Sequence, residues 1–488
     1  MFVDDDGRVY FYWGCSNATP IWGVELDSDT MKPLGERIEL IQNHKKEYGY
    51  ERVGENHQYD YKNNNVWLMM REQFAHQMGC KAEEITDLNP IIAALPEEQQ
   101  NILSTLLSDN PYIEGAWMTK YAGRYYLQYA CTGTEYNIYG DGVYVSDKPL
   151  GPFQVAKNNP YSYNPGGFIP GAGHGSTLED MKGRFWHTAT MRISMNHAME
   201  RRIGIWPAGF DQDGELFCNQ RYADWPVKIE DDVSDPWCNP EWMLLSYKKR
   251  VLASSGKETM LNVVDENVQT WWKAEKTSGN EWICVDLGRK ADVRAIQINF
   301  ADDSGIVQLP EGKEAVGAKE TPLRYIEEQI YYTQWLLEGS ENGENWFVIE
   351  DKRTAKTDLA HDFVVRENGI SARYIRLTIV SVPYNAPICI SGFRIFGHID
   401  CSKPEKAKEV KAVRVSGMDM HVTWEAHAQG AVVLWGHDEK KLYHSCLVHG
   451  KNSIMIGALV ADTEEYYVRV DLYNEGGITE GKTIKVTH

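Results

Sequence analysis

The sequence contains neither a C-x-x-C pair nor a run of roughly 18 uninterrupted apolar residues, the length that a membrane-spanning helix needs. The lack of such a run excludes a helical membrane protein. The lack of a C-x-x-C pair argues against a zinc site and a disulfide framework, because the nine cysteines are also scattered and odd in number. We therefore expect reduced thiols, which favour a cytoplasmic location.

Positive charge is also scarce. The 50 Lys and Arg residues are outnumbered by 70 Asp and Glu residues, which gives a formal net charge of −20. Such a chain repels phosphate backbones, which argues against nucleic acids as partners and favours neutral ligands.

The first residues, MFVDDDGRVYFYWG, have neither the basic nor the apolar region of a signal peptide. Because a start upstream of Met1 would hide such a signal, the location stays open.

The chain is long and rich in aromatic residues. Its 488 residues exceed a single hydrophobic core and predict about three to four domains. Its 16 Trp and 27 Tyr residues supply flat faces that stack on sugar rings as well as filling cores. A carbohydrate therefore fits the expected class of neutral ligand.

Three segments in the first half share one design, in which a glycine turn and an Arg precede an alternating aromatic strand. They are DDDGRVYFYWG at 4–14, YAGRYYLQYA at 121–130 and MKGRFWHTAT at 181–190. Between the first two, the stretch from about Arg71 to Asp109 has its apolar residues on one helical face, which predicts a helical insertion. The long spacing of the strands indicates the four-stranded blades of a β-propeller. Without the insertion, the chain up to about Tyr247 holds about three and a half blades, so we expect an incomplete propeller.

Four segments resemble, in this order, glycoside hydrolase family 43: DDDGRVYFYWG, IEGAWMTKYAGRYYLQYACTGTEYN, GAGHGSTLED and ERRIGIWPAGFDQDGELF. The resemblance extends over most of residues 1–230. It implies a five-bladed β-propeller with an axial sugar pocket, which hydrolyses β-xylosides, α-L-arabinofuranosides or related glycosides with inversion. It also implies an oligosaccharide or polysaccharide substrate and no cofactor for the chemistry, and it leaves the oligomeric state open.

The resemblance assigns the catalytic acid to Glu114. An inverting glycosidase needs one carboxylic acid to protonate the leaving oxygen and one carboxylate to activate water, about 6.5–9.5 Å apart. Glu114 in the run IEGAW matches the family's acid, with Ala116 in place of the usual Pro. The family's other two carboxylates are each the Asp of a D-P step, and both would lie before Met1. The aspartates from Asp4 to Asp6 match turn residues instead.

The resemblance also names contacts around the sugar. His174 of GAGHGS matches a histidine at the propeller axis that binds water or a metal ion, although a buried His bonded to backbone fits the same pattern. Arg201 of ERRIG matches an arginine that reaches the substrate, a role that Arg202 could exchange with it. Glu55 is a further candidate substrate contact. Trp117 could stack on a sugar ring, although strand aromatics more often pack in cores.

The chain changes pattern twice after the propeller. Residues 248–399, with EWICVDLG, ARYIRL and SGFRIFG, resemble a discoidin-type domain of the coagulation-factor C or family 32 carbohydrate-binding fold, which implies a jelly-roll β-sandwich. In that fold the turn at Asp265 and Asn267 commonly supports a structural Ca²⁺. Residues 400–488, with VRVSGMDMHVTWE and YYVRVDLYNEGGIT, resemble a fibronectin type III β-sandwich, a module we expect to be a spacer or a docking surface. The whole chain is therefore predicted to be all-β, with the incomplete propeller and its helical insertion in residues 1–247.

Three functions fit these observations. The first is an exo-acting, inverting β-xylosidase or α-L-arabinofuranosidase for plant hemicellulose oligosaccharides, with Glu114 as general acid. The second is a catalytically inactive carbohydrate-binding or structural fragment, because the two D-P aspartates fall outside the sequence. The third keeps activity by recruiting Glu51, Glu55 or a partner chain's carboxylate as the base. Glu51 and Glu55 also rival Glu114 for the pocket, because Tyr50 and other polar residues surround them.

Overall fold

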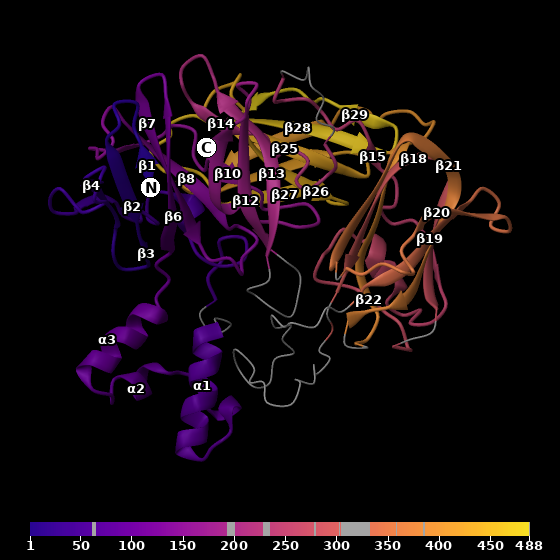
Figure 1. Cartoon of the computed structure of the whole chain (residues 1–488), viewed down its shortest axis with the longest axis horizontal. Helices are drawn as coiled ribbons and strands as arrows, with labels where there is room; N and C mark the ends of the chain where they lie inside the picture. Colours follow the sequence, from indigo (N-terminus) through magenta and orange to yellow (C-terminus); the bar gives the residue numbers. More distant parts are fainter. Residues whose placement is uncertain are drawn as a thin grey trace.

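The computed structural model shows a chain built mostly of antiparallel β-sheets (Figure 1). It describes residues 1–60, 65–192, 201–227, 235–277, 280–301, 303, 332–357, 359–383 and 386–487. The side chains of residues 65, 66 and 201 lie outside this description. Within the described residues, no helix is long and apolar enough to cross a membrane.

The described part of the first half of the chain forms three sheets. Their strand orders are β1-β2-β4-β5, then β10-β8-β7-β6-β3 with β9 beside β8, then β11-β12-β13-β14. The strands are β1 (Phe2–Val3), β2 (Val9–Trp13), β3 (Cys15–Ser16), β4 (Ile21–Leu26), β5 (Ile38–Ile41), β6 (Tyr112–Tyr121), β7 (Arg124–Thr132), β8 (Gly140–Ser146), β9 (Gln154–Val155), β10 (Ser162–Tyr163), β11 (Gly173–Glu179), β12 (Phe185–Arg192), β13 (Arg201–Phe210) and β14 (Leu216–Cys218).

The repeated glycine turns of the sequence make one hairpin in each of these sheets. Gly7, Gly123 and Gly183 have positive φ angles of 82°, 79° and 76°, and they join β1 to β2, β6 to β7 and β11 to β12. Glycine adopts this left-handed conformation without a Cβ clash. Two of the turns are closed by the same hydrogen bond, from the glycine N–H to the carbonyl of an aspartate three residues earlier. Gly7 donates to Asp4 at 3.0 Å, and Gly183 donates to Asp180 at 2.9 Å. The predicted repeat is therefore confirmed as a repeat of hairpins.

The insertion between the first two sheets is helical, as predicted. It contains α1 (Asn65–Met78), α2 (Asn89–Ile92), α3 (Glu97–Leu106) and a 3₁₀ turn at Ala82–Glu84, and a further 3₁₀ turn at Gly49–Glu51 precedes it. Trp67, Phe74 and Leu88 are buried in a small cluster formed by the insertion itself. In Figure 1 these helices extend away from the sheets. The insertion thus has its own core and leaves the pairing of the sheets intact.

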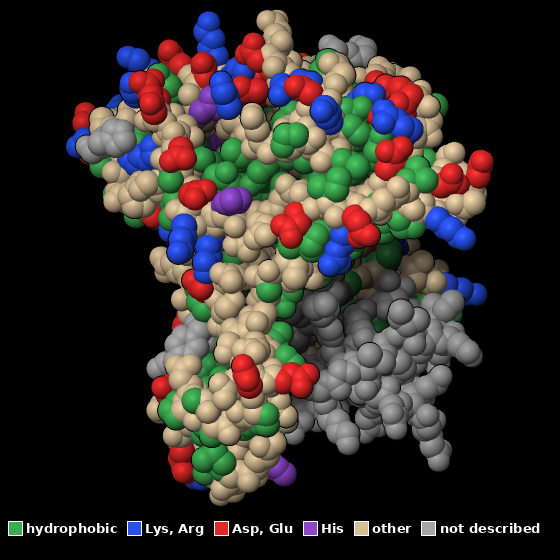
Figure 2. All heavy atoms as spheres, turned by 90° about the vertical axis from the view of Figure 1, so that its left-hand side faces the viewer, with side chains coloured by type: hydrophobic (Ala, Val, Ile, Leu, Met, Phe, Trp, Pro, Cys, Tyr) green, Lys and Arg blue, Asp and Glu red, His purple; other side chains and the backbone are tan. Residues whose placement is uncertain are grey.

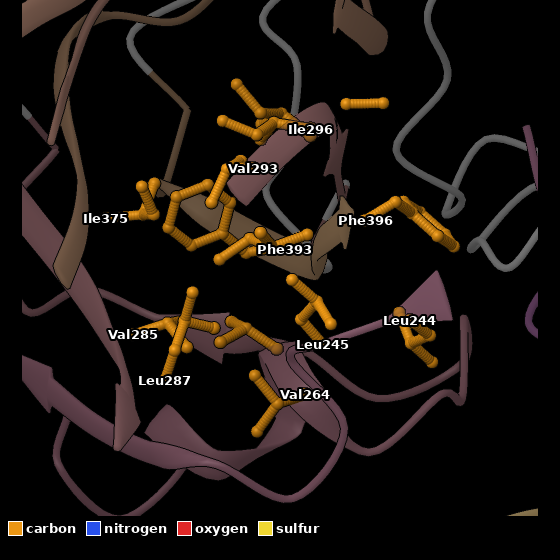
Figure 3. Packing of buried hydrophobic residues seen from close by; sticks show 14 of the residues in the cluster. Leu244, Leu245, Val264, Val285, Leu287, Val293, Ile296, Ile375, Phe393 and Phe396 are labelled. Atoms are coloured by element: carbon orange, nitrogen blue, oxygen red, sulfur yellow. The ribbon is translucent and has the colours of Figure 1, made fainter. Parts of the chain in front are cut away.

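The middle of the chain folds around one sheet in its described residues. The strand order is β15-β22-β18-β21-β19-β20, with β16 beside β18 and β17 beside β22. The elements are β15 (Met243–Leu244), β16 (Arg250–Ala253), a 3₁₀ turn (Met260–Val264), β17 (Trp272–Lys273), β18 (Glu281–Phe300), β19 (Gln334–Ser340), β20 (Trp346–Asp351), β21 (His361–Ser381) and β22 (Cys389–His398). The register of β18 against β21 shifts between Asp286 and Ala291, and such irregularities bend a sheet. Val285, Ile375 and Phe393 are buried in the cluster shown in Figure 3.

The last part of the chain has two sheets in its described residues, β23-β24-β27 and β26-β25-β28-β29 with β30 beside β28. Their strands are β23 (Lys408–Arg414), β24 (Met420–Glu425), β25 (Gly430–Gly436), β26 (His444–His449), β27 (Ser453–Ile456), β28 (Tyr467–Asn474), β29 (Gly477–Thr479) and β30 (Ile484–Lys485). Trp424, Val468 and Val470 are buried. Burial alternates along β24, as expected for a strand with one covered face, whereas β25 is buried along its whole length.

This last part is not a detached spacer. One hydrophobic cluster contains Tyr48 and Tyr50 from the first part together with Trp435 from β25. The backbone N–H of Gly49 donates to the Leu459 carbonyl at 2.8 Å. Because the two parts bury apolar surface against each other, each contributes to the stability of the other. Of the two expected roles, spacer or docking surface, this packing leaves the docking surface as the prediction.

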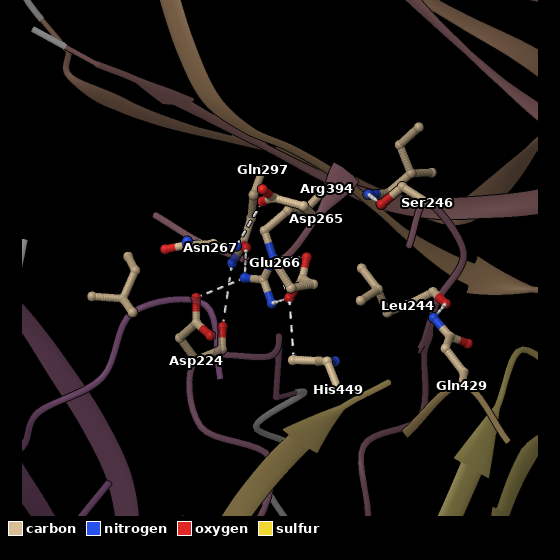
Figure 4. Close-up of polar contacts among 12 residues, drawn as sticks. Asp224, Leu244, Ser246, Asp265, Glu266, Asn267, Gln297, Arg394, Gln429 and His449 are labelled. Atoms are coloured by element: carbon tan, nitrogen blue, oxygen red, sulfur yellow. Dashed lines mark hydrogen bonds and ion pairs between the residues drawn. The ribbon is translucent and has the colours of Figure 1, made fainter. Parts of the chain in front are cut away.

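Arg394 joins all three parts of the chain in a buried ionic cluster (Figure 4). Its guanidinium lies 2.6 Å from the Asp224 carboxylate and 2.7 Å from the Glu266 carboxylate, and its side chain is 1% exposed. His449 Nε2 lies 3.7 Å from Glu266. Asp224 comes from the first part, Arg394 and Glu266 from the middle, and His449 from the last. The cluster therefore fixes the three parts relative to one another.

The first sheet is covered on one face. Tyr10 and Tyr12 of β2 are buried in the same cluster as Leu127 of the second sheet. Phe11, between these two tyrosines, is 41% exposed, because alternate residues of a strand point to opposite faces. Ile38 of β5 is also exposed, at 44%. Figure 2 looks onto this side of the molecule and shows hydrophobic side chains gathered in a band. The first sheet therefore packs on the second through one face and leaves apolar side chains exposed.

Candidate active site

Glu114 is the third residue of β6, at a break in the pairing of that strand. The register between β6 and β7 shifts between Glu114 and Trp117, and Gly115 has a φ of 63°. A Cβ on Gly115 would come within 2.8 Å of the His174 ring. Glycine is therefore needed here both for the backbone conformation and for the close approach. The bulge places the Gly115 backbone against the His174 ring.

Three hydrogen-bond donors surround the Glu114 carboxylate. The Tyr139 hydroxyl donates to Oε1 at 2.8 Å, the Cys15 thiol donates to Oε2 at 3.2 Å, and His174 Nδ1 lies 3.5 Å from Oε1. The hydrogen bonds and the ion pair that the described residues make to Glu114 all come from donors. The hydrogen bond from His174 is the largest influence, and together the donors outweigh burial and lower the pKa of Glu114 to about 2. In this arrangement Glu114 is ionised at neutral pH.

Two of these donors come from elements that the sequence does not link to the site. Cys15 lies in β3, directly opposite Glu114 in the pairing of β3 with β6. Tyr139 immediately precedes β8, and its ring packs on Gly173, where a Cβ would be 2.7 Å away. Burial, followed by the neighbouring Glu114, raises the pKa of Cys15 to about 11, so the thiol keeps its proton. No motif surrounds Cys15, and Tyr139 is one of several similar aromatics in its segment.

His174 projects from a hairpin whose shape depends on small neighbours. Its φ of 56° is a left-handed conformation that costs a non-glycine residue about 1 kcal/mol or more. Gly173 stands against Tyr139, and a Cβ on Gly175 would lie 2.4 Å from Nε2 of His187. The run GAGHGS therefore shapes the bulge of β11, between Gly173 and Ser176, that aims His174 at Glu114. Because its side chain is 48% exposed, His174 is not the buried, backbone-bonded histidine of the alternative interpretation.

Glu51 and Glu55, the rivals of Glu114, lie in different surroundings. Glu51 is fully buried, and its Oε1 accepts a hydrogen bond from the Tyr129 hydroxyl at 2.5 Å. Burial raises the pKa of Glu51 to about 7. This position removes Glu51 from any role in contact with substrate. The Glu55 carboxylate is 47% exposed and accepts hydrogen bonds from Arg192 Nη1 at 2.7 and 2.9 Å, so its substrate contact stays a prediction.

Three other residues were predicted to contact the sugar. Two of them, Trp117 and Arg202, make hydrogen bonds to backbone carbonyls, and the side chain of Arg201 is not described. The Trp117 indole donates to the Thr177 carbonyl of β11 at 3.1 Å, which ties the second sheet to the third. Arg201 begins β13, and its side chain lies outside the described residues. Arg202 donates to the carbonyl of Ala360 in the middle part at 3.1 Å. Sugar binding by Trp117 and Arg201 stays a prediction.

Metal ions were predicted at His174 and at the turn of Asp265 and Asn267. Among the described residues, no group of three or more His, Cys, Asp and Glu side chains is placed to hold a metal ion. Asp265 accepts the Asn267 N–H at 2.8 Å and the Thr270 hydroxyl at 2.6 Å within one turn. Calcium takes about six to eight oxygen ligands, more than these side chains supply. A calcium ion at this turn and an ion at His174 stay predictions.

A cavity of about 420 Å³ lies apart from Glu114. Tyr121 and Gly183, at the far ends of β6 and the β11–β12 hairpin, line it together with Phe210 and Phe217. Neither Glu114 nor any of its three donors borders this cavity. It is therefore not part of the candidate active site.

Comparison with known proteins finds similarity to glycoside hydrolases. The family model of glycosyl hydrolases family 43 matches residues 57–216, a stretch that contains Glu114 and His174. This stretch, about a third of the chain, is therefore similar to that family. "Xylosidase/arabinosidase 43A" from Humicola insolens is 26% identical over 240 residues, which are 44% of this chain and 57% of that protein. The match thus spans little more than half the length of that relative.

Solved structures similar to the chain include two glycoside hydrolases. One is 17% identical, with a TM-score of 0.37, and the match covers 81% of this chain and 69% of that chain. The other is a thermostable family-43 glycoside hydrolase that is 18% identical, with a TM-score of 0.28, and the match covers 44% of this chain and 55% of that chain.

Proposed function

We propose that the chain is a glycoside hydrolase that acts on hemicellulose oligosaccharides, with Glu114 as its general acid. The observation that carries the proposal is the position of Glu114 in a strand bulge within the family 43 stretch, where 20% of its side chain is open to solvent. The relative named as a xylosidase/arabinosidase supports a pentoside as substrate. Hydrolysis by paired carboxyl groups needs no cofactor.

The finer proposal is an exo-acting, inverting β-xylosidase or α-L-arabinofuranosidase whose three N-terminal sheets are blades of a propeller. Glu114 would protonate the leaving oxygen, and a base about 6.5–9.5 Å away would activate water on the opposite face of the sugar. His174 would orient the carboxyl group of Glu114 and contact the sugar, because it is exposed beside Oε1.

A general acid must carry a proton before it can donate one. The three donors lower the pKa of Glu114 to about 2, so the acid lacks its proton at neutral pH. A second carboxylate beside Glu114 would raise this pKa, because two like charges in one site disfavour each other. The proposed activity therefore requires a carboxylate beyond the described contacts of Glu114, such as the family's D-P aspartates.

Release of pentose by the whole chain from xylobiose and from arabino-oligosaccharides, whose leaving sugars need a proton, tests the proposal. Glu114→Gln should reduce kcat by about 10²–10⁴-fold, the usual contribution of a general acid. The matched control is Glu179→Gln, an exposed glutamate at the end of β11, which should leave the rate unchanged. Undiminished turnover by Glu114→Gln would overturn the assignment.

A second function, an inactive carbohydrate-binding or structural protein, is favoured by one observation. The described contacts of Glu114 are all donors, and Glu51 is buried too deeply to serve as the base. Such a chain would bind xylo- or arabino-oligosaccharides in calorimetry, and chromatography of the same samples would show no shorter products. Normal turnover by this polypeptide excludes this function.

For the later parts of the chain we propose the discoidin-like and fibronectin type III-like folds that their sequences resemble. The bent antiparallel sheet from β15 to β22 supports the first, and the two packed antiparallel sheets from β23 to β30 support the second. Sugar binding by the middle part would appear as affinity for oligosaccharides that survives Glu114→Gln. Loss of all affinity in that variant would contradict it.

A further inference from the structure

Asp141 of β8 lies beneath the His174 hairpin and holds its backbone with both carboxylate oxygens. Oδ1 accepts the N–H of His174 at 2.7 Å, and Oδ2 accepts the N–H of Gly175 at 2.9 Å. Because Asp141 is 1% exposed, these bonds form away from water and are charge-assisted. One buried carboxylate thus fixes two successive peptide groups.

The hairpin needs such a support because its backbone is strained. His174 has a φ of 56°, and a non-glycine residue keeps this conformation only where its surroundings over-determine it. At the next residue, a Cβ on Gly175 would lie 2.6 Å from Oδ2 of Asp141. The glycine therefore allows the backbone to approach the carboxylate closely enough to be held.

His187 of β12, in the neighbouring sheet, packs beside Asp141. Its Nε2 lies 3.3 Å from Oδ2 of Asp141, and its Nδ1 lies 3.2 Å from the Thr177 hydroxyl. The side chains of Asp141 and His187 are 1% and 0% exposed. Both residues stand on paired strands in the interior, so the carboxylate is anchored to the scaffold and not to a loop.

We propose that Asp141 is a positioning residue of the candidate active site. It fixes the His174 hairpin so that His174 and Glu114 keep the geometry in which Glu114 acts. The effect passes through His174, whose Nδ1 lies 3.5 Å from Glu114 Oε1, and through Tyr139, which packs on Gly173 in the same hairpin. The catalytic consequence of this proposal rests on the proposed function, whereas the support of the hairpin does not.

Hydrogen exchange tests the support without any need for activity. The measurement follows the peptide spanning residues 172–178 by mass spectrometry on the whole chain. Asp141→Asn keeps the size of the side chain and removes its charge, so exchange of the His174 and Gly175 amides should accelerate by roughly tenfold or more, the loss expected for hydrogen bonds to a charged group. Unchanged exchange would overturn the proposal.

The matched control is Glu281→Gln in the middle part of the chain. Glu281 is 4% exposed and accepts hydrogen bonds from the hydroxyls of Ser254 and Ser255, so the variant also neutralises a buried carboxylate. Exchange in residues 172–178 should stay at the wild-type rate.

If Asp141→Asn fails to fold, Gly175→Ala gives a second test, because its Cβ displaces the hairpin from Asp141 and should produce the same local acceleration.

Kinetics on xylobiose, whose leaving sugar needs a proton, tests the catalytic consequence. Asp141→Asn should lower kcat by about ten- to a hundredfold and change KM by no more than about twofold, because a misplaced catalytic group weakens transition-state binding more than substrate binding. Glu281→Gln should change neither constant. Accelerated exchange with an unchanged kcat would overturn the positioning role. An inactive wild-type chain with accelerated exchange in Asp141→Asn would instead overturn the proposed function and leave the hairpin support standing.

Discussion

Glu114 shows how neighbours from separate elements set the state of one carboxylate. Cys15, Tyr139 and His174 come from β3, the start of β8 and β11, and all three donate toward its oxygens. The resemblance of IEGAW and GAGHGS to glycoside hydrolase family 43 motifs predicts Glu114 and His174. It misses Cys15 and Tyr139 because cross-strand pairing and ring packing leave no local pattern. The free thiols expected from the scattered cysteines include Cys15.

The thiol of Cys15 gives a direct probe of these surroundings. Burial and then Glu114 raise its pKa to about 11, so little reactive thiolate is present at neutral pH. Alkylation of Cys15 by iodoacetamide should therefore still be accelerating between about pH 9 and pH 10.5, as followed by peptide mass spectrometry. Glu114→Gln should shift the profile to lower pH. A rate that levels off below about pH 9 in the wild type would contradict this description.

Glu51 should make stability depend on pH. Burial raises its folded-state pKa from 4.5 to about 7, so the folded chain holds a proton that the unfolded chain releases within this interval. The contribution of Glu51 is then fully present below pH 4.5 and is lost as the pH rises to about 7. Glu51→Gln should flatten this decline in the thermal midpoint. Parallel curves for the two proteins would show that Glu51 has no raised pKa.

The elements of the first half were largely predictable because they repeat. Gly7, Gly123 and Gly183 mark hairpins by a conformation that glycine favours, and helical periodicity marks the insertion. How the elements of separate parts meet was not predictable. The hydrogen bond from the Gly49 N–H to the Leu459 carbonyl joins residues about four hundred positions apart. Tyr48 and Tyr50 beside it each have the pattern of an ordinary core residue.

The ion pair of Arg52 with Asp419 tests this contact. Arg52 Nη2 lies 2.5 Å from Asp419 Oδ1, and the two side chains are 25% and 24% exposed. Asp419→Ala should lower the free energy of unfolding by about 1–3 kcal/mol, because it leaves a partly buried charge without its partner. Urea denaturation measures the change. Asp351→Ala, which breaks a more exposed pair with Arg353, is the control, and an equal loss in both variants would contradict a shared core.

At the scale of the whole molecule, Arg394 is the most buried charge that connects the parts. It lies between Asp224 and Glu266, close to His449, and so brings together segments that the sequence presents as separate modules. The module sequences predict cores of their own, because strand alternation is local. They do not predict this junction, because a lone Arg within a strand resembles a surface residue.

Removing the charge of Arg394 should destabilise the whole chain. Arg394→Met leaves Asp224 and Glu266 buried without a cation, and breaking such a cluster costs about 3–5 kcal/mol. Chemical denaturation followed by tryptophan fluorescence measures the loss. Arg373→Met, whose pair with Asp286 is 37% exposed on the arginine side, should cost far less. Similar losses for the two variants would show that the junction is not a stabilising centre.

The role of Glu114 as the proton donor is tested most directly by the leaving group. Wild-type chain and Glu114→Ala are compared on xylobiose, whose leaving sugar needs a proton, and on 2,4-dinitrophenyl β-D-xylopyranoside, whose leaving group departs without one. If Glu114 is the general acid, its removal should reduce the rate on xylobiose by about 10²-fold or more beyond any reduction on the aryl glycoside. Equal reductions on both substrates would contradict the assignment.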